Sequence, residues 1–113
     1  MANNVINLDD FRAREGKKYS KVFTGRDRGA DVRKASRIDE IEANNESVII
    51  IIPDQVYSIN PSFFEELLKN VVLKLGKNGF FEKFKIESRG SYQYEAPLAE
   101  AIERILKEKT AIG

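Results

Sequence analysis

One run of hydrophobic residues dominates the middle of the chain, from Val48 to Ile52. A run this apolar and β-branched is typical of a strand with both faces covered, as at the centre of a parallel sheet. Pro53 follows it and ends the strand, because proline cannot donate a ladder hydrogen bond. We therefore predict a central, buried strand over residues 47–52.

Apolar residues at three-to-four-residue spacing, which is typical of amphipathic helices, occur in three other segments. The second segment has the clearest start, because Asn60 is a good N-cap and Pro61 suits the first helical position. Gly76 is expected to end that helix, and the sequence KNG after it to form a turn. The predicted helices cover about 30–43, 61–76 and 95–109.

Shorter strands are predicted beside these elements: NVINLDDF as a weak strand or extended arm, YSKVF, and FFEKFKIES with Phe84 and Ile86 on one face. Strands that alternate with helices favour an α/β fold with right-handed crossovers. We predict a small mixed sheet with a parallel core flanked by three helices. Residues 1–18 would form an N-terminal arm or edge strand, and 19–109 a single domain.

The composition removes whole classes of chemistry, because the 113 residues include no cysteine and no histidine. Thiolate and histidine metal sites, disulfides and Ser-His-Asp triads are therefore excluded. A carboxylate-only site for a hard cation stays possible in principle. The acidic pairs are sequence neighbours whose side chains point apart on a helix, so none indicates an acid/base dyad. We expect no enzyme activity and no cofactor.

No apolar run approaches the roughly 18 residues that cross a bilayer. The first ten residues, MANNVINLDD, lack the basic and apolar regions of a signal peptide. We expect a soluble, cytoplasmic protein with no membrane partner.

Charge is distributed unevenly although the net charge is only +1. Residues 11–37 hold ten basic residues against three acidic ones, and the rest of the chain is acidic. Such a segment is a solvated surface or a basic arm for nucleic acid or an acidic protein. Lys17, Lys18, Lys21, Arg26 and Arg28 would then contact phosphates.

The stretch VIIIIPDQVYSINPSFFEELLKNV resembles the core of STAS domains, in which a buried strand leads through a short loop into an amphipathic helix. Asn60 stands where the family has an aspartate, and Phe63 replaces a glycine. The similarity extends to the STAS-like domain of unknown function, found in bacteria and phages. TGRDRGADVRK matches its Gly-Arg motif, and Ser62, Phe63, Glu66 and Leu67 match its Ser-Phe-x-x-Glu-Leu motif. The resemblance covers about residues 19–106.

This resemblance implies a regulatory protein-interaction module and not an enzyme. Its partner would be a histidine-kinase-like ATPase or an anti-sigma factor, and Ser62 would be the serine whose phosphorylation breaks the complex. Arg26 would be structural or contact the partner. Nucleic-acid binding through 11–37 is the alternative function, and the oligomeric state stays open.

Physical chemistry gives Ser62 two roles that the sequence leaves open. A phosphate there would meet helix-starting N–H groups and add about two negative charges, whereas Glu65 and Glu66 one turn away would repel it. The simpler role is an ordinary helix-start residue. In both cases we predict a partner surface over 54–60 and the first helical turn. Phe63, at the margin of the apolar stripe, is expected to be partly exposed there. Arg26 and Arg28 are candidate contacts for phosphate or carboxylate.

Overall fold

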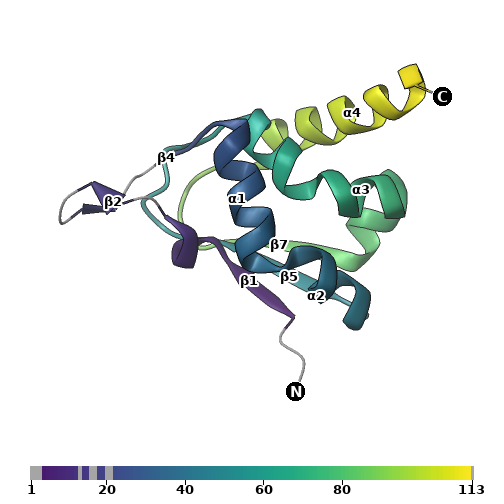
Figure 1. Ribbon diagram of the computed structural model, residues 1–113. Helices are drawn as coiled ribbons and strands as arrows, with labels where there is room; N and C mark the ends of the chain where they lie inside the picture. Colours follow the sequence, from purple (N-terminus) through teal and green to yellow (C-terminus); the bar gives the residue numbers. More distant parts are fainter. Residues whose placement is uncertain (1–3, 13, 16–17, 20–21, 113) are drawn as a thin grey trace.

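The computed structural model describes residues 4–12, 14–15, 18–19 and 22–112, with side chains for 4–12 and 22–108 (Figure 1). Its central sheet consists of three parallel strands in the order β1-β5-β7: β1 (Val5–Asn7), β5 (Val48–Ile52) and β7 (Phe84–Ser88). Val48, Ile50 and Ile52 of the middle strand are fully buried. The predicted α/β fold with a parallel core is therefore confirmed, and so is the central strand.

The first predicted helix is two helices, α1 (Arg26–Ser36) and α2 (Ile38–Asn44). Arg37 separates them in the left-handed conformation, with φ 59° and ψ 37°. The apolar spacing continues across this break, which is why the sequence predicted one helix. Among the described residues, the sheet is accordingly accompanied by four α-helices and not by three.

Helix α3 (Pro61–Lys83) is interrupted at Gly76, whose φ of 76° and ψ of 175° are not helical. The predicted turn at KNG is wrong, because the chain resumes a helical path at once. Phe80 is the physical reason: it is fully buried and stacks on Phe84 with ring centroids 4.7 Å apart. Helix α4 (Glu95–Ile112) follows β7 after a loop. Among the described residues, no helix has the length and apolar character to cross a membrane.

Helix α3 lies between α1 and α4 and packs against both (Figure 1). Its approach to α1 is unusually close at Gly29, where an added Cβ would lie 2.5 Å from the carbonyl oxygen of Phe63. The same Cβ would lie 3.0 Å from the Cβ of Glu66. A glycine that disfavours helix formation is therefore used here to bring two helices together.

Helix α2 is joined to α3 by a buried acid. The Glu42 carboxylate is held 2.8 Å from the Lys74 ammonium and 2.6 Å from that of Lys83. Burial by itself would raise the pKa of Glu42, but the hydrogen bonds from the two lysines outweigh it. The pKa therefore lies below its ordinary value of 4.5.

Shorter elements gather beyond the carboxyl ends of the central strands. The 3₁₀ helix η1 (Leu8–Phe11) follows β1, and Ile6 and Leu8 lie in the core. β4 (Val22–Phe23) pairs in parallel with β6 (Ser58–Ile59). β2 (Arg14–Glu15) and β3 (Lys18–Tyr19) form an antiparallel pair at the same end of the molecule (Figure 1).

Candidate functional site

The loop from Pro53 to Tyr57 leaves the carboxyl end of β5, the usual place for binding sites in parallel sheets. Asp54 and Gln55 are exposed, and Gln55 has a positive φ of 60°. Val56 is buried, whereas the Tyr57 side chain is 71% exposed. The loop therefore has an apolar anchor next to an exposed aromatic ring.

Arg12 ties this loop to η1. Its Nη2 donates to the carbonyl oxygens of Asp54 and Gln55, at 3.3 Å each, and its Nη1 lies 3.1 Å from Asp9 Oδ1. The side chain of Arg12 is only 9% exposed. The largely buried side chain of Arg12 thus holds the backbone of the loop at Asp54 and Gln55.

Tyr92 holds the other end of the loop. Its hydroxyl accepts a hydrogen bond from the Ile59 N–H at 3.0 Å and donates one to the Ile59 carbonyl at 3.2 Å. On the opposite side of β6, the N–H of Asn60 donates to the Phe23 carbonyl at 2.9 Å. Both edges of the two-residue strand are therefore satisfied, and the strand cannot shift without breaking these bonds.

We call the exposed part of this region the loop surface: Val22, Asp54, Gln55, Tyr57 and Ser58. Val22 is 43% exposed and is the register partner of Ser58, the residue after Tyr57. Val22 in β4 and Tyr57, the residue just before β6, are thus exposed large hydrophobic residues on neighbouring segments of the described chain.

The predicted helix start is present next to this surface. Asn60 caps α3, since its Oδ1 accepts from the Ser62 N–H at 2.8 Å. Ser62 is half-buried in the first turn, and Glu66 lies one turn further along α3. Phe63 corrects one expectation: it is fully buried, with its ring centroid 5.1 Å from that of Phe23. It cannot offer contact area to a partner, because β4 covers the margin of the apolar stripe.

The two candidate arginines, Arg26 and Arg28, contact different parts of the chain. Arg26 Nη1 lies 2.7 Å from Glu65 Oε2 and 3.7 Å from Glu66 Oε1, so the structure joins Arg26 to Glu66. The hydrogen bond that Arg26 donates to Glu65 raises the pKa of Arg26 above its ordinary value. Arg28 points elsewhere and donates to the carbonyl oxygen of Phe11 in η1. It acts as a tether between α1 and η1.

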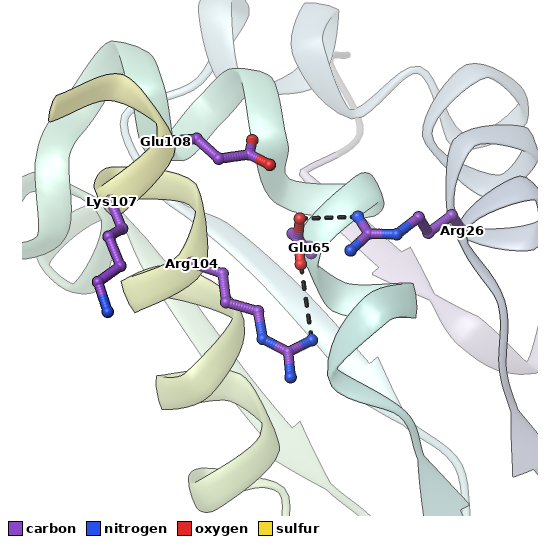
Figure 2. Close-up of a pocket in the computed structure, with 5 residues that line it drawn as sticks. All are labelled: Arg26, Glu65, Arg104, Lys107 and Glu108. Carbon is purple, nitrogen blue, oxygen red and sulfur yellow. Dashed lines mark hydrogen bonds and ion pairs between the residues drawn. The ribbon is translucent and has the colours of Figure 1, made fainter. Parts of the chain in front are cut away.

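Glu65 stands at the base of an open pocket of about 300 Å³, which we call the Glu65 pocket. Figure 2 shows Arg26 and Arg104 reaching the Glu65 carboxylate from opposite sides, from α1 and α4. The Glu65 side chain is only 4% exposed, and Arg104 Nη1 is 3.8 Å from its Oε1. Oε1 is buried without a hydrogen-bond partner in the part of the chain described. The lining residues are Arg26, Glu65, Arg104, Lys107 and Glu108.

Sequence reasoning missed Tyr92 and the Glu65 pocket, and it did not single out Tyr57. Tyr57 lay within the predicted surface, but its exposure follows from the burial of its neighbour Val56. The pocket depends on three helices that meet, and no local spacing indicates which charges they bring together. Lys17 and Lys21 lie outside the described residues. Within the described ranges, no group of three or more acidic side chains is placed to hold a metal ion.

Comparisons with known proteins match this chain to no family model, no curated protein and no solved structure. The observations that bear on function are therefore the geometry of the loop surface and of the Glu65 pocket, together with the sequence resemblance.

Proposed function

We propose that the chain is a non-catalytic, cytoplasmic regulatory module that binds a protein partner through the loop surface. The observation that carries this proposal is Tyr57, a 71% exposed aromatic side chain on a backbone held at both ends. Exposed tyrosines in such positions are typical centres of protein interfaces, because they offer a large apolar face and one polar group.

The fixed backbone favours binding for an entropic reason. Arg12 holds the loop carbonyls, and Tyr92 holds Ile59. A loop ordered before binding loses less conformational entropy when it meets a partner. Val22, on the strand that pairs with β6, adds a second exposed apolar residue to the loop surface, and the exposed Asp54 and Gln55 form a polar rim.

The partner class comes from the resemblance to STAS-like domains: a histidine-kinase-like ATPase or an anti-sigma factor. Ser62 is the proposed phosphorylation site. It lies in the first turn of α3, beyond the Asn60 cap and next to the loop surface. A phosphate there would add about two negative charges close to the interface, and an acidic partner would then be released.

Affinity capture from the native host, followed by mass spectrometry, tests this proposal. Wild type and Phe81→Ala are expected to recover the same partner, whereas Tyr57→Ala and Ser62→Asp lose it. Phe81 is a matched control because it is 45% exposed but lies just before the opposite, amino end of β7. Circular dichroism confirms folding of each variant. If Tyr57→Ala captures the partner as well as wild type does, the interface does not lie at the loop surface.

Nucleic-acid binding through 11–37 has less support, because the five arginines of this segment whose side chains are described have partners within the chain. Arg12, Arg26, Arg33 and Arg37 make ion pairs, and Arg28 binds a carbonyl. Titration with duplex and single-stranded oligonucleotides at two salt concentrations tests this alternative. Salt-sensitive binding that is lost on neutralising Lys17, Lys18 and Lys21 would replace our proposal.

A further inference from the structure

The buried oxygen of Glu65 indicates a second binding site, separate from the loop surface. Oε2 is satisfied by Arg26 at 2.7 Å, but Oε1 accepts no hydrogen bond from the described chain. Arg104 Nη1, at 3.8 Å, is near enough to interact electrostatically but too far to donate a hydrogen bond. A buried carboxylate oxygen in this state gains from a donor supplied by a ligand.

The size of the pocket limits the ligand. A volume of about 300 Å³ is at the low end of the range of roughly 300–1,000 Å³ found for small-molecule sites. The pocket is therefore suited to a compact molecule and not to a nucleotide or an extended peptide.

The charges around the pocket exclude a strongly charged ligand. Basic and acidic side chains cancel in pairs: Arg26 with Glu65, Arg33 with Glu66, and Arg104 with Glu100. The remaining lining residues, Lys107 and Glu108, have opposite signs and no close ion pair among the described residues, although Glu108 interacts with the charge of Arg26 at longer range. A site with one unpaired group of each sign favours a ligand that also has one of each.

The arrangement in Figure 2 separates the two signs. Arg104 and Glu108 both extend from α4 toward Glu65, one on either side of its carboxylate, whereas Lys107 extends along the other side of α4. We propose that the Glu65 pocket binds a small zwitterion of the free α-amino-acid type. Its ammonium group donates to Glu65 Oε1 and its carboxylate meets Arg104, so that the ligand lies between these two side chains, with Lys107 and Glu108 at the rim.

Entry of such a ligand needs only a side-chain movement. Arg104 is 43% exposed, and its ion pair with Glu100 is a surface pair of the i,i+4 type, which is weak. When the guanidinium swings outward, Oε1 becomes accessible. Arg26 keeps Oε2 occupied throughout, so the Glu65 carboxylate stays correctly placed.

The test uses the full chain and isothermal titration calorimetry with a panel of free amino acids at millimolar concentrations. We expect saturable binding by at least one of them. Its N-acetyl derivative lacks the ammonium group and its amide lacks the carboxylate. Each is expected to bind at least about tenfold more weakly, as for the loss of one charged hydrogen bond.

Variants at the rim locate the site without disturbing the core. Glu108→Gln and Lys107→Gln are expected to weaken binding by about two- to fivefold, since both side chains are exposed. Glu103→Gln is the control, because Glu103 is exposed on the same helix but does not line the pocket. Glu65→Gln should abolish binding in a chain that remains folded.

Several results would overturn the proposal. Failure of every amino acid in the panel to bind saturably would leave Oε1 to water alone. The N-acetyl derivative binding as tightly as its parent would remove the role of the ammonium group. Unchanged affinity in both rim variants would place the ligand elsewhere on the protein.

Discussion

Replacing Gly29 by alanine tests how α1 and α3 are held together. The new Cβ would lie 2.5 Å from the Phe63 carbonyl oxygen and 3.0 Å from Glu66 Cβ, whereas ordinary contact begins near 3.4 Å. The nearer atom belongs to the backbone and cannot rotate away. The two helices would therefore have to move apart by most of the difference between the 2.5 Å approach and an ordinary contact distance of 3.4 Å.

Two opposing effects decide whether Gly29→Ala raises or lowers the free energy of unfolding. Alanine favours a helix over glycine by about 0.8–1 kcal/mol. Overpacking of a rigid contact costs about 1–3 kcal/mol, and separation of the helices also lengthens the ion pairs of Arg26 and Arg33. We expect Gly29→Ala to lower the free energy of unfolding by about 1–2 kcal/mol, and the melting temperature by roughly 5 °C per kcal/mol.

Gly79→Ala is the matched control, since Gly79 is also helical but an added Cβ there meets only the Leu75 side chain, at 3.2 Å. Its helix-propensity gain should dominate, so the variant is expected to be neutral or stabilised by up to about 1 kcal/mol. Urea denaturation followed by circular dichroism measures both. If Gly29→Ala is as stable as wild type, the close approach of α1 and α3 is wrong.

Three further substitutions test other contacts. Glu42→Gln should lower stability at pH 7 by about 1–3 kcal/mol, because two lysines lose a charged acceptor. The lowered pKa of Glu42 means that its contribution is present above the ordinary 4.5 and is lost as the pH falls through the folded-state pKa. Tyr92→Phe removes both bonds to Ile59 and should cost about 1–3 kcal/mol, whereas Tyr94→Phe should cost less. Asn60→Ala removes the cap of α3 and should cost about 0.5–2 kcal/mol.

Denaturation at two pH values checks the first of these, and at pH 7 the other two. A Glu42→Gln deficit that is as large at pH 3 as at pH 7 would contradict the assigned ion pairs. Equal stability of Tyr92→Phe and Tyr94→Phe would mean that the hydroxyl of Tyr92 does not hold β6. If the stability of Asn60→Ala equals that of wild type, water replaces the side-chain cap of α3 at no cost in free energy.

The central strand was predictable because its burial on both faces is recorded directly in its composition. The breaks at Arg37 and Gly76 were not, for different reasons. Arg37 adopts a conformation that arginine rarely favours, so its identity carries no signal for a break. Gly76 was recognised, but the helix resumes after it because burial of Phe80 outweighs the turn tendency of KNG.

The features of the candidate sites likewise differ in whether residues close in sequence determine them. Asn60 and Ser62 were predictable as a helix start, because capping depends on residues close in sequence. The burial of Phe63 was not, since it depends on β4, which lies far away in the chain. The pairing of Glu65 with Arg104 likewise requires α3 and α4 to meet. Helical periodicity indicates which face of α3 is apolar, but not which charges border it.

The first two turns of α3 connect the loop surface with the Glu65 pocket, and this decides how a Ser62→Asp result is interpreted. Ser62 and Glu66 are four residues apart and therefore share one side of the helix. A negative charge at Ser62 competes with Glu66 for Arg26 and Arg33, which lie 3.7 Å and 3.4 Å from that carboxylate. Partner loss in this variant has two possible origins, repulsion at the loop surface or rearranged ion pairs. Amino-acid affinity distinguishes them, because only rearrangement at Arg26 would also change the pocket.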